Sequence, residues 1–115
     1  MDIRDRSFDF SAQTVHFCQT LTATSGALPQ LAASLLQAAC ALGLQVEEAH
    51  GSAKTDFIAQ MQAAAKSARA THYWLRLIEQ TKLANPLLLE PLQDEAHQLA
   101  AILSSIVKTA KRNEG

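Results

Sequence analysis

The stretch from Leu31 to Leu77 constrains the fold most, because it holds two long apolar-periodic segments joined by the small hinge His50-Gly51-Ser52. In both segments apolar or small residues recur in steps of three and four, which places them along one face of a helix. The first series is Leu28, Leu31, Leu35, Ala38, Leu42, Gln45 and Ala49. The second series is Phe57, Met61, Ala64, Ala68, Thr71 and Leu75. The pattern predicts two long helices that fold back on each other.

A further helix is expected before this hairpin. Either Ser7 or Ser11 can cap it with a side-chain oxygen, and the polar, glycine-ending run 22–26 is expected to end it. The second helix should then start near Pro29, because proline is tolerated in a first turn. Ser52 is a suitable cap for the third helix.

A last helix follows the break at Asn85-Pro86, with Pro91 expected in its first turn. Its apolar series is Leu88 or Leu89, Leu92, Ala96, Leu99, Ile102 or Leu103, Ile106 and Ala110. Four helices joined by short loops favour an antiparallel up-down four-helix bundle. We therefore interpret residues 1–115 as a single all-α domain of this kind.

The two long helices have more apolar surface than one core face requires. A second apolar strip on the third helix lies well around the helix axis from the main stripe. On the second helix, Gly43 lowers helix stability by about 1 kcal/mol relative to alanine unless a close helix crossing offsets this cost. A helix that is apolar on two sides buries the second side elsewhere, and subunit association is the simplest outlet. The alternative is that the alanines are solvent-exposed helix formers. The predicted oligomer interface is Gly43, Ala63, Ala70, Trp74 and Leu77.

The charge balance limits the partners. Ten Lys and Arg stand against eleven Asp and Glu, a formal net charge of −1, whereas dedicated nucleic-acid binders usually carry a basic excess. Any basic surface must therefore be local. A basic strip on the third helix consists of Lys66, Arg69, Tyr73 and Arg76, and a second cluster consists of Lys108, Lys111 and Arg112.

Cations beside an aromatic ring suit a phosphate backbone with unstacked bases. The strip therefore predicts a nucleic-acid contact, of which RNA is one form, and a symmetric oligomer would repeat it into a stronger field. The alternative is a solvated helix face with local pairing, for instance of Arg76 with Glu79 or Glu90.

The sequence predicts no enzyme, metal or cofactor. It contains no glycine-rich phosphate loop, no G-x-S-x-G and no H-E-x-x-H. Glu47 to His50 matches the Glu-x-x-His unit of bundle metal sites, and Asp94 to His97 resembles it, but the further inward glutamates of such sites are missing. Capping and solvation at helix ends explain both histidines.

The remaining signals indicate a cytoplasmic protein that does not enter the membrane. Cys18 and Cys40 lie in apolar segments without metal-ligand spacing and are interpreted as buried free thiols of a reducing compartment. The N-terminus lacks a secretory apolar region. The most apolar run, 31–46, is shorter than the roughly 20 residues of a spanning helix.

The chain resembles a known family in three stretches, IRDRSFDFS, LAASLLQAACALGLQVEEAHGSAKTDFIAQM and SARATHYWLRL. They are similar to the four-helix-bundle proteins encoded by intervening sequences in bacterial 23S ribosomal RNA genes, also called S23 ribosomal proteins. The resemblance implies an antiparallel four-helix bundle that forms a homopentameric ring. It extends to the accessory variability protein of diversity-generating retroelements, which is linked to nucleic-acid and reverse-transcriptase binding.

Individual positions carry this resemblance. Those that match the family are Leu35-Leu36, Gly43, Glu47-Glu48-Ala49, Asp56-Phe57 and Tyr73-Trp74-Leu75. Two positions depart from it: Gln37 stands where the family has Arg, and Leu44-Gln45 where it has Ala-Asn. The missing cation at Gln37 weakens a nucleic-acid role for the second helix.

Two functions of different classes follow. The first is a non-enzymatic, nucleic-acid-associated accessory protein that works as an oligomer. The second is a structural or protein-interaction oligomer without nucleic-acid contact, which the near-neutral charge favours.

Overall fold

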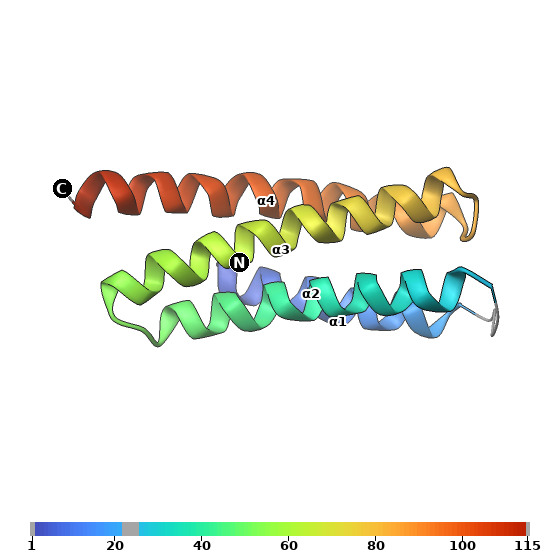
Figure 1. Cartoon of the computed structure of the whole chain (residues 1–115), viewed down its shortest axis with the longest axis horizontal. Coiled ribbons are helices and arrows are strands. Elements are labelled where there is room, and N and C mark those ends of the chain that lie inside the picture. Colours follow the sequence, from blue (N-terminus) through green and yellow to red (C-terminus); the bar gives the residue numbers. More distant parts are fainter. Residues whose placement is uncertain (1, 22–25, 115) are drawn as a thin grey trace.

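The computed structural model describes residues 2–21 and 26–114, and over these residues the chain is all-α (Figure 1). Its elements are α1 (Ile3–Gln19), α2 (Leu28–His50), α3 (Lys54–Gln80) and α4 (Pro86–Glu114). The prediction of an all-α chain with four helices packed against one another is confirmed. No helix among the described residues is long and apolar enough to cross a membrane.

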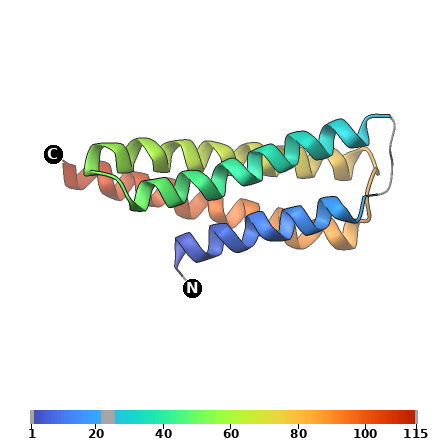
Figure 2. The same cartoon turned by 90° about the horizontal axis from the view of Figure 1, so that it is seen from below.

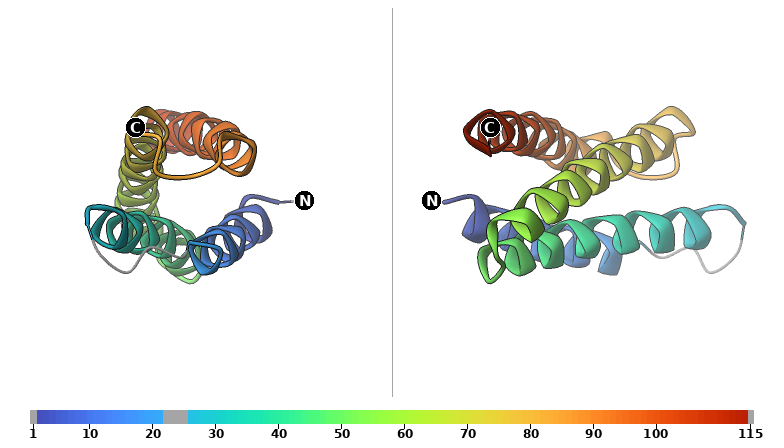
Figure 3. Two further views of the ribbon diagram at one scale, coloured as in Figure 1. Left: turned by 90° about the vertical axis from the view of Figure 1, so that its right-hand side faces the viewer. Right: turned by 60° about the vertical axis from the view of Figure 1, so that its left-hand side comes forward.

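The four helices lie along an elongated body with extents of 50 × 24 × 20 Å. Helix α2 packs against α1 and α3, α3 packs against α4, and α1 also contacts α4. Seen from the end of the body, α1 and α4 lie on the same side of the α2–α3 pair, α1 next to α2 and α4 next to α3 (Figure 3). Helix α3 starts beside the end of α2 and runs obliquely toward α4 (Figure 1). It is therefore the element that borders both neighbours along its length.

The core follows most of the predicted helical spacing, but Ile58 rather than Phe57 is buried on α3, and Val107 rather than Ile106 is buried on α4. The buried side chains of α3 include Met61, Ala64, Ala68, Thr71 and Leu75, as predicted. Those of α4 are Leu89, Leu92, Ala96, Leu99, Leu103 and Val107. On α2, however, Ala39 and Val46 enter the core, whereas the predicted Ala38 and Gln45 are only half-buried. The reason is geometric: α2 has partners on two sides, so its buried arc is rotated from the series read in the sequence.

The predicted start of α1 was wrong. The helix begins four residues before Ser7, and its cap is Asp2, whose Oδ1 accepts a hydrogen bond from the backbone N–H of Asp5 (2.9 Å). Ser7 and Ser11 lie inside the helix, where Ser7 is buried and the Ser11 hydroxyl donates to the carbonyl of Ala39 on α2. The helix ends at Gln19 rather than within 22–26, of which residues 22–25 lie outside the described part.

Two other helix-start predictions also need correction. Ser52 does not cap α3, because its hydroxyl donates to the carbonyl of Glu48 in the preceding helix (2.6 Å). Pro91 is not in the first turn of α4, because Pro86 already occupies that turn. Asn85 precedes it, and its Oδ1 accepts from the N–H of Leu87 (3.0 Å), as an N-cap does.

The close crossing predicted at Gly43 is confirmed. Gly43 is buried beneath α1, and a Cβ placed on it would lie 2.5 Å from Ser11 Oγ. That hydroxyl donates to the backbone carbonyl of Ala39 on α2 (2.8 Å). The glycine thus permits a contact between α1 and α2 of the same chain.

One polar clamp joins α1 to α4 (Figure 2 shows these two helices side by side). The guanidinium of Arg6 donates to both carboxylate oxygens of Glu95, at 2.7 and 2.8 Å, and to Gln98 Oε1 at 2.7 Å. A bidentate pair of this kind fixes orientation as well as distance.

The two cysteines are free, but they are not both buried as predicted. Cys18 is half-buried, and burial raises the pKa of its thiol. Cys40 is exposed, because it lies outside the arc of α2 that is buried in the core.

Candidate functional site

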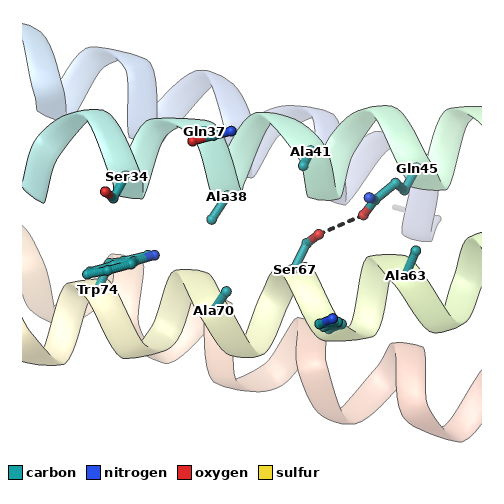
Figure 4. Close-up of a pocket in the computed structure, with 10 residues that line it drawn as sticks. Ser34, Gln37, Ala38, Ala41, Gln45, Ala63, Ser67, Ala70 and Trp74 are labelled. Carbon is teal, nitrogen blue, oxygen red and sulfur yellow. Dashed lines mark hydrogen bonds between the residues drawn. The ribbon is translucent and has the colours of Figure 1, made fainter.

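A groove of about 500 Å³ runs between α2 and α3 (Figure 4). Its walls are mostly small side chains, with Ala38 facing Ala70 across it and Trp74 facing Ser34 at one end. Lys66 adds a cation to its lining. The remaining lining residues are Gln37, Ala41, Gln45, Ala63 and Ser67. The groove exists because alanine and serine on both helices leave the outer flank of this helix pair unfilled.

A polar contact between α2 and α3 crosses this groove toward the end away from Trp74. The Ser67 hydroxyl on α3 lies 2.7 Å from the Gln45 side-chain amide on α2 (Figure 4). Turning the amide over keeps this contact and adds hydrogen bonds from its nitrogen to the carbonyls of Ala41 and Ala63, each at 3.1 Å. Gln45 therefore pins α2 to α3, which explains why a polar residue occupies an apolar helical series.

The predicted interface residues separate into three groups. Ala63, Ala70 and Trp74 line the α2–α3 groove together. Leu77 is half-buried and lines a smaller depression of about 320 Å³ with Tyr73 and Arg76, among others. Gly43 lies beneath α1 of its own chain and is not exposed on this surface.

The predicted basic strip is exposed along α3. Lys66, Arg69, Tyr73 and Arg76 are all exposed, but they do not turn toward the same neighbour. Lys66 borders α2, whereas Arg69 and Arg76 line a groove between α3 and α4. The ring of Tyr73 meets Trp74 edge-on, with centroids 5.1 Å apart and planes at 77°.

The alternative interpretation, in which local ion pairs neutralise the strip, is not supported. Among the residues that the structure describes, the one ion pair is Arg6 with Glu95. Arg76 is paired with neither Glu79 nor Glu90 there. Its positive charge remains available.

The second predicted cluster lies elsewhere. Lys108, Lys111 and Arg112 are exposed near the end of α4. That end lies level with the start of α3, because Lys54 Nζ donates to the carbonyl of Asn113 (3.2 Å). The basic strip lies further along α3 than this end of the bundle.

The α3–α4 groove contains residues that the sequence did not single out for binding. It has a volume of about 500 Å³, and Arg69, His72 and Arg76 enter it from α3. From α4 come His97 and the small residues Ala100, Ala101 and Ser104. The imidazole centroids of His72 and His97 are 5.4 Å apart.

The charged side chains that line this groove are all basic. Partial burial lowers the pKa of His72, and the positive charges of Arg76 and His97 lower it further. No carboxylate lines the groove. Its four titratable or charged side chains are therefore all cationic or able to become so.

The sequence signal for the histidine pair was weak. His72 and His97 are distant in the sequence, and only the register of α3 against α4 brings them together. No group of three or more His, Cys, Asp or Glu side chains that could hold a metal ion occurs in the part of the chain that the structure describes.

Comparison with solved structures gives a match over almost the whole chain. A protein of unknown function from the S23 ribosomal protein family of Bacteroides thetaiotaomicron superposes with a TM-score of 0.81. The match covers 93% of this chain and 99% of that protein, at 24% sequence identity. This chain has the S23 ribosomal protein fold. The resemblance seen in the sequence is thus confirmed at the level of the fold, although no family model and no curated protein matches the chain.

Proposed function

We propose that this chain is a non-enzymatic, nucleic-acid-associated accessory protein of the cytoplasm. It is an antiparallel up-down four-helix bundle that assembles into a ring-shaped homo-oligomer, pentameric as the resemblance implies. RNA binds to the basic strip of α3, and each subunit contributes one copy of it.

The observation that carries the nucleic-acid role is the unpaired, exposed basic strip. Three cations and one aromatic ring share the outer side of α3, and no carboxylate neutralises the cations among the described residues. One such strip is a weak field on a chain of net charge −1. Repetition around a ring would place several strips against one phosphate backbone, and electrostatic contributions to binding accumulate with each phosphate contacted.

Two complementary surfaces support the ring. The first is the α2–α3 groove with Trp74 and Lys66. The second lies on α1, where Phe8 is 64% exposed in a depression that also contains Asp5, Asp9 and Glu47. Phe8 suits the α2–α3 groove of a second subunit in size, because the groove is lined by small side chains. The carboxylates around Phe8 suit the charge of Lys66 in that groove. Contacts between two different surfaces of one protein generate rings when the rotation closes.

The test of RNA binding uses charge reversal with a matched control. Arg69→Glu/Arg76→Glu should weaken binding of a short oligouridylate in fluorescence anisotropy, because both changes turn attraction into repulsion. Each lost phosphate contact should also lower the slope of log affinity against log salt by about 0.7. Arg4→Glu, an exposed cation on α1, is the control of equal charge change for the single variants Arg69→Glu and Arg76→Glu, and it should have a smaller effect than either. Equal binding by the strip variant and the control would reject the role.

The test of the ring uses two variants that each damage one surface. Trp74→Glu and Phe8→Glu should both lower the mass measured by light scattering from about five protomers toward one, since each buries a charge in the contact. An equimolar mixture of the two should form a dimer, because each variant keeps the surface that the other has lost. An unchanged mass for Trp74→Glu would count against the assembly.

A structural or protein-interaction oligomer without nucleic-acid contact is the second candidate. The near-neutral charge and the sequence pI of about 6.4 favour it. It predicts that the ring forms normally and that RNA binding is absent at low salt. The similarity to the accessory variability protein stays a prediction under either function.

A further inference from the structure

The α3–α4 groove combines features that do not serve the packing of the bundle. Arg69 and Arg76 flank it, and His72 and His97 lie between its two helices. Like-charged or chargeable groups placed together oppose each other, so their proximity costs free energy in the unbound protein. That cost is recovered when an anion lies among them.

The floor and walls of the groove also suit an anion. Ala100 and Ala101 leave room, and Ser104 offers a hydroxyl that can donate. Asp94 and Glu79 lie one turn from His97 and Arg76 and do not line the groove, and Glu95, two residues before His97, pairs with Arg6 instead. Guanidinium groups match the oxygens of a phosphate in geometry as well as charge.

The geometry points to the α3–α4 groove as a phosphate-binding site that protonation of His72 strengthens. The phosphate comes from a nucleic-acid backbone or from the free anion. This inference rests on the proposed RNA role and deepens it, since Arg69 and Arg76 belong to both.

The direction of the pH effect follows from the charges. In the unbound protein, burial, Arg76 and His97 hold the pKa of His72 below its usual value, so His72 is mostly neutral at neutral pH. A bound phosphate favours the charged imidazolium and raises that pKa. Binding then takes up protons, and affinity must rise as the pH falls, by up to about tenfold per pH unit for each proton taken up.

The experiment measures oligouridylate affinity at about pH 8 and about pH 5.5, on either side of the ordinary histidine pKa of about 6.5. Phosphodiesters keep their charge over this interval, so the change reports on the protein. We expect the dissociation constant of the unaltered chain to fall roughly tenfold or more on acidification. His72→Gln/His97→Gln should lose most of that change. Lys66→Ala, a cation outside the groove, should weaken binding similarly at both pH values.

A second arm uses inorganic phosphate without RNA and follows the imidazole ring signals of His72 and His97 by NMR at about pH 5.5, below the ordinary histidine pKa of about 6.5. Ring shifts that saturate, and that disappear in Arg69→Ala/Arg76→Ala, support the site. If RNA binds but its pH dependence survives in the double histidine variant, this inference is overturned and the proposed function stands. If RNA does not bind at any pH, the proposed function fails, and the experiment with inorganic phosphate decides whether the groove is a phosphate site. Saturating ring shifts then support a site for the free anion, and their absence overturns the inference.

Discussion

The contact between Gly43 and Ser11 allows a sharp test of how α1 is held against α2. Gly43→Ala replaces the least helix-favouring residue after proline in mid-helix, and in an open position this change would stabilise the fold by about 1 kcal/mol. Here the new Cβ would lie 2.5 Å from Ser11 Oγ, although it would lie at ordinary distances of 3.5 Å from Ser11 Cβ and 3.6 Å from the carbonyl oxygen of Ser7. The hydroxyl oxygen is therefore the single atom in the way.

Removing that obstruction has a definite cost. The hydroxyl must leave its position and give up the 2.8 Å hydrogen bond to Ala39, worth about 1 kcal/mol. The helices must also shift slightly, at about 1 to 2 kcal/mol for mild overpacking. Set against the gain in propensity, Gly43→Ala should destabilise the chain by about 1 to 2 kcal/mol.

The same substitution should have the opposite sign when Ser11 is already alanine. Without the oxygen, Gly43→Ala should stabilise by about 1 kcal/mol, which gives a coupling of about 2 to 3 kcal/mol between the two positions. The four proteins are compared by urea unfolding with far-ultraviolet circular dichroism, at one protomer concentration because association would add to stability. A similar change in unfolding free energy in both backgrounds would refute the argument.

Three further predictions concern other contacts. Arg6→Ala should cost about 1 to 2 kcal/mol and raise hydrogen exchange in α1, because it leaves the partly buried carboxylate of Glu95 without its charged partner; unchanged exchange would show that the clamp does not hold α1. Asn85→Ala should cost about 1 kcal/mol in urea unfolding through loss of the cap to Leu87. Because the pKa of His72 is lowered in the folded chain, stability should fall as the pH drops below the ordinary histidine value of about 6.5, and His72→Gln should flatten that decline. An equally steep decline in the variant would assign it to other groups.

The sequence was informative about the fold because helix formation and burial leave a local record. Steps of three and four located all four helices, and they correctly placed Met61, Ala64, Ala68, Thr71 and Leu75 in the core. The mid-helix glycine predicted a close crossing for a reason that is also local, the cost of glycine in a helix.

Helix starts were less well determined. Several polar residues near each start can accept the same hydrogen bond, and the sequence does not rank them. Ser7 and Ser52 were plausible caps, yet Asp2 caps α1 and no side chain caps α3. The choice depends on which hydroxyls are required inside the bundle or bind the preceding helix.

The candidate sites divide in the same way. The sequence by itself determined that Lys66, Arg69, Tyr73 and Arg76 share one side of α3, because their spacing fixes their direction around a single helix. Only the tertiary structure decided that Lys66 borders α2 while Arg69 and Arg76 border α4, and that a histidine from each of α3 and α4 meets between them. The physical reason is that periodicity describes a helix about its own axis. The identity of its neighbours, and their register along it, are set by the packing of all four helices together.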